Sequence, residues 1–255
     1  MEITLNELLA GNATTIKNKE YFPTRAYVEP FLERMQKYTD DFRVQVKLPD
    51  QLALDDNTPV NVYNRVVVQA VLPNELVVND HSQVVGMVYG LDVRKPIIKF
   101  YSGALDNVCT NLCVFSPEQL SVSALEPESA VNYKPVTQII ESIEDTCKFI
   151  QKLKNTPFTC DYKNTSEKLG DWVKSCINST YDNGFGKVKI STSTPVDAYK
   201  LLFEDKESRY YIKDGESNMY NVYGAFTQIF TDSIKRDLMN VCEKTILLKQ
   251  ILNIF

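Results

Sequence analysis

The chain has 255 residues, of which 44% are hydrophobic and 24% are charged, and this composition is that of an ordinary globular protein. Its 28 Lys and Arg against 33 Asp and Glu give a net charge of −5. That balance argues against a basic coat for nucleic acid over the whole surface, but it does not exclude a local cationic face. The single histidine, His81, excludes a metal site built from several histidines.

The first 40 residues predict two helices. Leu5, Leu8 and Leu9 form a short apolar stripe that ends at Gly11, a common helix terminator. A second stripe, over residues 28–38, predicts a longer helix. We therefore expect residues 1–40 to be N-terminal helices.

Residues 41–127 predict an antiparallel sheet, because the hydrophobic period changes there from about 3.6 to 2. In the first strand Phe42, Val44 and Val46 alternate with polar residues. Further segments rich in β-branched and aromatic residues are separated by gaps too short for parallel crossovers. These predicted strands span residues 60–71, 83–93, 97–101, 108–115 and 120–125. Together they predict an antiparallel β-meander of five to six strands.

Residues 128–255 predict mainly helices. Apolar residues recur at steps of three and four from Pro135 to Asn155, and a smaller helix is expected over 167–177. The turn residues at 182–184 precede a short β-ribbon near 185–191. A last apolar stripe begins at Met219 and predicts a long C-terminal helix, either continuous or broken once, because uncapped helices much longer than 25 residues are unusual in compact domains. Strands followed by helices indicate the α+β class, and we expect a single α+β domain over residues 1–255.

Cationic strand faces are the first candidate for function. Arg43 and Lys47 share one face of the first predicted strand, and Lys187 and Lys189 share a face of the later ribbon. Such side chains neutralise phosphates, while tyrosines of the same sheet region (Tyr63, Tyr89 and Tyr101) could stack on unpaired bases. The alternative is that these cations belong only to the solvated face of a sheet. The candidate nucleic-acid-binding residues are Arg43, Lys47, Arg65, Lys99, Lys187 and Lys189.

Two other motifs favour structural interpretations. Cys109 and Cys113 are four residues apart, but the second ligand pair that a zinc site needs is absent, so packing is expected. The segment Asn183–Gly186 contains a lone G-x-G and is more typical of a hairpin turn than of a nucleotide site. We therefore expect no catalytic residues, no bound metal and no cofactor.

A third motif leaves an enzymatic alternative open. Glu204-Asp205-Lys206 follows the acidic residues Asp182 and Asp197, and an acid followed by E-x-K occurs in metal-dependent nucleases. There the carboxylates hold a divalent ion and the lysine steadies water or phosphate. A solvated helix end explains the same residues more simply.

Two stretches resemble a phage- and plasmid-encoded protein family of unknown function. Val108-Cys109-Thr110-Asn111 is similar to the family's "V-C-T-N-G" element, and residues 218–227 (NMYNVYGAFT) are similar to its late "lyNAfT" element. The chain departs from the family at Leu112, where Gly is expected, and at Gly224, where Asn is expected. The resemblance implies a mobile-element origin and a role beside replication, recombination or host takeover.

The sequence thus favours a phage or mobile-element accessory protein without catalytic activity that binds nucleic acid, including single-stranded DNA binding or annealing. The alternative is a protein-interaction factor, either an inhibitor of a host enzyme or a virion component. The N-terminus lacks a signal-peptide pattern, and no segment approaches the roughly 18 apolar residues needed to span a bilayer. We expect no membrane partner, a homo-oligomer, and a cytoplasmic location (the host cytoplasm for a phage protein).

Overall fold

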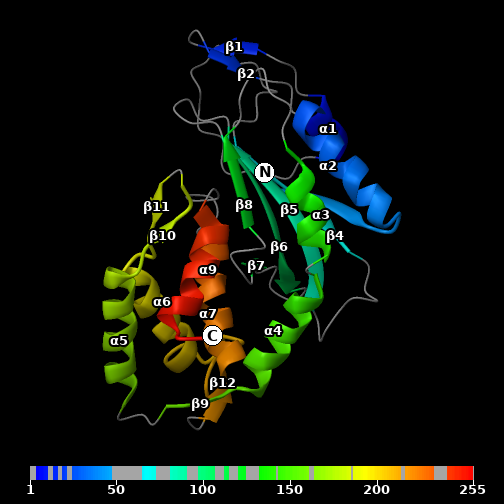
Figure 1. The fold of residues 1–255 in the computed structure, drawn as a ribbon. Coiled ribbons are helices and arrows are strands. Elements are labelled where there is room, and N and C mark those ends of the chain that lie inside the picture. The colour runs from blue at the N-terminus through cyan, green and yellow to red at the C-terminus, as the bar shows by residue number, and fades with distance from the viewer. Residues whose placement is uncertain are drawn as a thin grey trace.

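The fold is a mixture of helices and an antiparallel sheet, shown as a computed structural model in Figure 1. For some residues at the ends of the elements, Arg43, Lys47 and Arg65 among them, only the backbone is described. The described residues are 4–10, 14–16, 19–21, 25–47, 65–72, 81–90, 97–106, 112–114, 120–124, 132–141, 143–160, 164–184, 186–213, 216–232 and 240–254.

The two predicted N-terminal helices are confirmed as α1 (Leu5–Leu9) and α2 (Arg25–Tyr38). A capping box begins α1: the Thr4 hydroxyl accepts from the Glu7 amide at 3.2 Å, and the Glu7 carboxylate accepts from the Thr4 amide at 2.6 Å. Between the helices lies a hairpin of β1 (Thr14–Ile16) and β2 (Lys19–Tyr21) that was not predicted. Strands of three residues carry too little alternation to be recognised.

The central sheet has six described strands, and all of its pairs are antiparallel. They are β3 (Arg43–Lys47), β4 (Arg65–Val71), β5 (His81–Gly90), β6 (Ile97–Asp106), β7 (Leu112–Val114) and β8 (Leu120–Ala124). The predicted α+β class is therefore confirmed.

The predicted meander of five to six strands is wrong as a continuous arrangement. Strands β3, β4, β5 and β6 pair in chain order, but β7 and β8 both pair with β6. Strand β7 pairs with residues 103–105 and β8 with residues 97–101, on the edge that β5 leaves open. Because β6 is ten residues long, one edge accommodates two short strands end to end.

Both faces of the sheet are covered over its central strands β4, β5 and β6. On one face Val66, Val68 and Phe100 pack with residues of α1, α2 and α3 (Lys134–Glu141). On the other, Val67 and Val88 pack against the C-terminal helix α9 (Val241–Ile251). We call this second surface the α9 face. The valine-rich strand β4 is buried on both sides for this reason.

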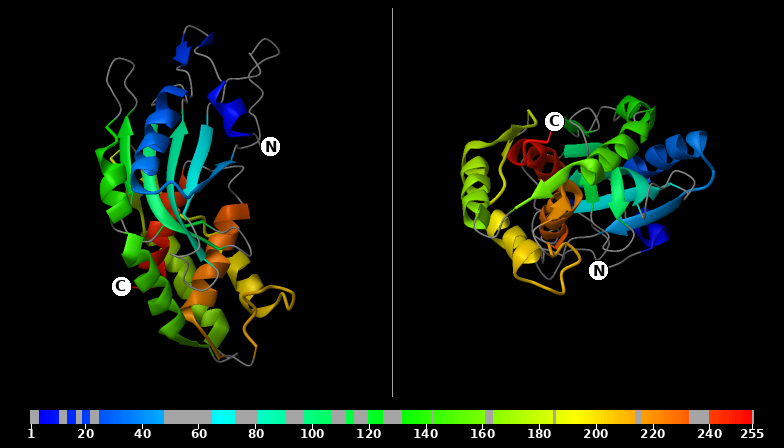
Figure 2. Two further views of the ribbon diagram at one scale, coloured as in Figure 1. Left: turned by 90° about the vertical axis from the view of Figure 1, so that its right-hand side faces the viewer. Right: turned by 90° about the horizontal axis from the view of Figure 1, so that it is seen from below.

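The rest of the C-terminal half forms a helical group around a further apolar core (Figure 1). Viewed from below, its helix α5 and the N-terminal helix α2 lie at opposite sides of the molecule (Figure 2). Its elements are α4 (Ile143–Asn155), α5 (Thr165–Asn178), α6 (Ser193–Phe203) and α7 (Met219–Asp232), with β9 (Pro157–Thr159) paired to β12 (Glu216–Asn218) and β10 (Tyr181–Asp182) paired to β11 (Lys187–Val188).

The predicted long C-terminal helix is not continuous: its apolar stripe divides between α7 and α9, and the alternative with a break agrees with this. Helices α7 and α9 pack against each other, and the Tyr223 hydroxyl donates to the Thr245 carbonyl at 3.4 Å. A single straight helix could not place these residues side by side. The apolar stripe continued through both segments because α9 is buried around most of its circumference.

The predicted short ribbon near 185–191 corresponds to β10 and β11, whose residues begin slightly earlier in the chain. That the chain forms a single domain remains a prediction. Within the described residues, no helix combines the length and the apolar character that crossing a bilayer requires.

Candidate nucleic-acid interface

The hairpin β10–β11 presents two of the predicted cations to solvent. Lys187 and Lys189 are exposed, whereas Val188 and Ile190 between and after them are buried. This period-2 alternation directs both ammonium groups away from the core. Of the six predicted binding residues, these two are the ones that the structure places on the surface with described side chains.

The turn of this hairpin is held by its own polar side chains. The Asp182 carboxylate accepts a hydrogen bond from the Gly184 amide at 2.9 Å, and the Asn183 side-chain oxygen accepts from the Gly186 amide at 3.0 Å. Gly184 has a φ of 82°, a conformation that glycine adopts without steric cost. The prediction of a hairpin turn at Asn183–Gly186 agrees with this geometry.

A buried ionic network lies directly behind the turn. Lys99 of β6 is 1% exposed, Glu243 of α9 is 0% exposed, and the Lys99 ammonium donates to Glu243 Oε1. The Asn183 side-chain amide donates to the same oxygen at 2.7 Å. Among the described residues, Glu243 Oε2 has no hydrogen-bond partner. The network joins the sheet, α9 and the hairpin at one point.

The prediction that Lys99 contacts nucleic acid is therefore wrong. It assumed that the second face of the sheet is solvated, as in many antiparallel sheets. Helix α9 covers that face at Val67, Val88 and Tyr101, so a lysine at position 99 lies in the interior. Burying its charge requires a counter-ion, which Glu243 provides.

Arg43, Lys47 and Arg65 lie elsewhere in the sheet, and their side chains are outside the described part of the structure. Arg43 and Lys47 belong to β3, the edge strand next to β4. In register, Lys47 is opposite Val67, Val67 is opposite Val88 and Val88 is opposite Lys99. Three strand spacings of ~4.8 Å thus put Lys47 about 14 Å from Lys99.

The hairpin lies beside α9, on the side of the sheet away from β4 (Figure 1). The predicted cations therefore do not gather on one strand face. They divide into the buried Lys99, the residues of β3 and β4 at one side of the sheet, and the exposed pair Lys187 and Lys189 near the other.

Two of the three tyrosines that we proposed as stacking surfaces are buried. Tyr89 and Tyr101 are both 0% exposed, and Tyr63 lies outside the described residues. Tyr101 instead accepts a hydrogen bond from the Gln69 side chain at 2.7 Å within the α9 face. Burial there raises the pKa of the Tyr101 hydroxyl well above its usual value.

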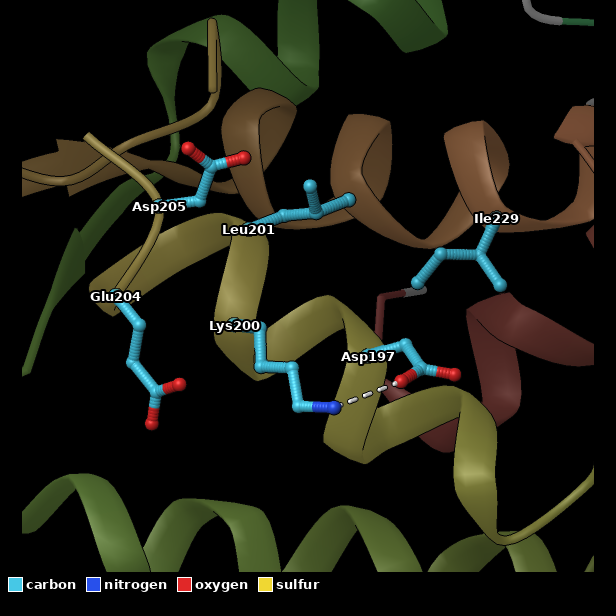
Figure 3. A pocket seen from close by; sticks show the side chains of 6 residues that line it. All are labelled: Asp197, Lys200, Leu201, Glu204, Asp205 and Ile229. Carbon is cyan, nitrogen blue, oxygen red and sulfur yellow. Dashed lines mark hydrogen bonds and ion pairs between the residues drawn. The ribbon is translucent and has the colours of Figure 1, made fainter. Parts of the chain in front are cut away.

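The Glu204-Asp205-Lys206 motif borders a pocket of about 530 Å³ between α6 and α7. Figure 3 shows the Glu204 and Asp205 carboxylates at the end of α6, with Ile229 contributed by α7. The Lys200 ammonium pairs at 3.4 Å with Asp197, one turn away on the same helix. With three carboxylates and one ammonium, the lining repels phosphates.

The same motif gives the nuclease alternative no geometric support. Within the described ranges, no three His, Cys, Asp or Glu side chains are grouped as a metal ion requires.

Cys109 lies outside the described residues, and of Cys113 only the backbone in β7 is described. Cys160, Cys176 and Cys242 are buried. Burial raises the pKa of Cys176 to about 11, so that thiol is protonated at neutral pH.

His81 lies next to the first turn of α7, within residues 218–227, the stretch that resembles the late element of the phage and plasmid family. The Tyr220 hydroxyl and His81 Nε2 are 2.7 Å apart, and His81 is 5% exposed. At the other end of the stretch, a Cβ on Gly224 would approach the Tyr210 ring to 2.3 Å, which requires glycine at this position. The stretch therefore acts in packing. The Val108–Asn111 element lies outside the described residues.

Comparison with protein-family models, with curated proteins and with solved structures gives no match for this chain. The functional argument therefore rests on the residues described above. Sequence reasoning missed Glu243 as the partner of Lys99, and Asn183 as a second donor to Glu243. The signal for Glu243 was a lysine between Ile98 and Phe100 in an apolar strand, which implies a counter-ion somewhere in the chain.

Proposed function

We propose that this protein binds the backbone of nucleic acid through the hairpin β10–β11, with Lys187 and Lys189 as the contacting cations. The observation that supports the proposal is their joint exposure on a hairpin whose turn is tied to the buried Glu243. Ammonium groups on neighbouring positions of one hairpin neutralise neighbouring phosphates and release counterions. The net charge of −5 does not oppose this, because the attraction is local.

The other parts of the proposal rest on the amino-acid sequence. The resemblance to a phage- and plasmid-encoded family favours an accessory protein of a mobile element, acting in the host cytoplasm without catalysis. Single-stranded DNA is the proposed target, and self-association along the strand is the expected mode of binding. Two backbone contacts per chain are weak alone, and repetition along a strand multiplies them.

The experiment is a titration of fluorescently labelled single-stranded DNA with the full chain at low salt, followed by anisotropy. We expect binding that K187A/K189A weakens about tenfold or more, since each lost phosphate contact removes a favourable charge interaction. The matched control is K206A/K213A, which removes the same charge from exposed lysines outside the hairpin.

Duplex DNA of the same length is the second ligand in this titration, because charge contacts alone do not distinguish the two forms. Tighter binding to the single strand would support the proposed target. Absence of binding to both ligands at low salt would overturn the proposal and favour the protein-interaction alternative. Equal losses in the two double variants would also overturn the assignment to the hairpin.

A further inference from the structure

We infer that Asn183 and Glu243 are positioning residues that hold Lys187 and Lys189 in a binding-competent arrangement. The inference rests on the proposed function and adds the contacts that order the two lysines. Glu243 is 0% exposed and therefore does not reach the proposed ligand, and the side-chain amide of the partly buried Asn183 donates to it at 2.7 Å.

The hairpin needs such an anchor because its strands are only two residues long. An isolated two-stranded hairpin is marginally stable at best. Its strands pair Tyr181 with Val188 and Asp182 with Lys187, and the Asn183 amide donates to the Gly186 carbonyl at 3.3 Å. Side-chain contacts must therefore supply much of its order.

The Asn183 side chain makes two of the contacts that order the turn. Its oxygen accepts from the Gly186 amide at 3.0 Å, which closes the loop directly before Lys187. Its amide donates to the Glu243 carboxylate, which fixes the loop to α9. Hydrogen bonds to a charged, buried acceptor are stronger than neutral ones at the surface.

Glu243 can serve as this acceptor because Lys99 compensates its charge. An unpaired carboxylate with 0% exposure would lose its hydration without compensation. The Lys99 ammonium donates to the same Oε1 atom that accepts from Asn183. The network thus connects residues 99, 183 and 243, which are far apart in sequence and converge beneath the exposed lysines.

Ordering the lysines before binding affects affinity in a specific way. A hairpin that is already ordered does not lose conformational entropy when it meets the strand. Loss of the anchor therefore weakens binding, but the bound complex still contacts the same phosphates. The number of released counterions, and with it the salt dependence, stays unchanged.

The test uses two variants that remove the Asn183–Glu243 hydrogen bond by different routes. Asn183→Ser keeps a short side-chain oxygen that can accept from the Gly186 amide, but it cannot reach Glu243. Lys99→Met with Glu243→Leu removes the acceptor, leaves the net charge unchanged and replaces the ion pair by apolar side chains, a change that proteins tolerate well. Both variants are titrated with labelled single-stranded DNA at several salt concentrations.

We expect both variants to bind about tenfold more weakly, with a salt slope equal to that of the unmodified protein. Hydrogen exchange of the amides near Lys187 should be faster in the free variants and slow again when DNA saturates them. Unchanged affinity in both variants would overturn the positioning inference and leave the proposed function intact. A changed salt slope would also overturn it, because the residues would then alter the contacts themselves.

If the proposed function is wrong, the binding data differ in another way. In that case K187A/K189A binds as the unmodified protein does, whatever the behaviour of the two anchor variants. The two sets of variants therefore separate the ligand contact from the device that positions it.

Discussion

Two lysine-bearing regions of this protein look alike in sequence and differ in the fold. Lys99 lies on β6 within the α9 face and is 1% exposed, whereas Lys187 lies on β11 and is open to solvent. Both occupy alternating positions of antiparallel strands. What separates them is the presence of α9, which covers one region and leaves the outer side of the other free. A cation on a strand is therefore evidence of a binding surface only when nothing packs over it.

The largest expected effect on stability comes from a substitution of the buried lysine, Lys99. Lys99→Met alone leaves the fully buried Glu243 without its counter-ion, and loss of one partner of a buried pair costs about 3–5 kcal/mol of the free energy of unfolding. The measurement is chemical denaturation followed by circular dichroism.

Two matched variants control that experiment. Lys187→Met makes the same substitution at an exposed position and should change the free energy of unfolding by no more than about 0.5 kcal/mol. Lys99→Met combined with Glu243→Leu should regain most of the lost stability, since neither charge is then left alone. Equal effects of Lys99→Met and Lys187→Met would contradict the assigned burial.

A smaller effect on stability is expected from the hydrogen bond between Tyr101 and Gln69 in the α9 face. Tyr101→Phe removes the hydroxyl that accepts from Gln69 at 2.7 Å and should cost about 1–3 kcal/mol, because the buried amide then lacks this partner. Gln69→Leu combined with Tyr101→Phe should be nearly neutral, as both polar groups are gone. If the double variant is less stable than Tyr101→Phe, the hydrogen bond is not what couples these residues.

The sequence predicted much of the fold because local signals were strong. Alternating β-branched residues identified the segments that became β3 to β8, and apolar spacing identified α2, α5 and the region of α3 and α4. The pairing of both β7 and β8 with β6 had no such signal, since it depends on the length of β6. The short strands β9 and β12 are likewise joined only by tertiary contact.

The candidate site was predictable only in part. Lys187 and Lys189 followed from alternation within the hairpin itself, which is a local property. The burial of Lys99 depends on α9, whose Glu243 lies more than a hundred residues later in the chain. A glutamate between Cys242 and Lys244 reads as ordinary helix surface, because one residue alone does not show which side of a helix is covered. Contacts at this separation are set by packing.

The most direct test of nucleic-acid binding by the hairpin is the salt dependence of single-stranded DNA affinity. The logarithm of the binding constant should fall linearly with the logarithm of salt concentration, with a slope of about −0.7 for each neutralised phosphate. Removing both hairpin lysines in K187A/K189A should therefore reduce the magnitude of the slope by about 1.4. The control K206A/K213A should keep the slope of the unmodified protein. A slope that K187A/K189A leaves unchanged, or that both variants reduce equally, would contradict contact through the hairpin.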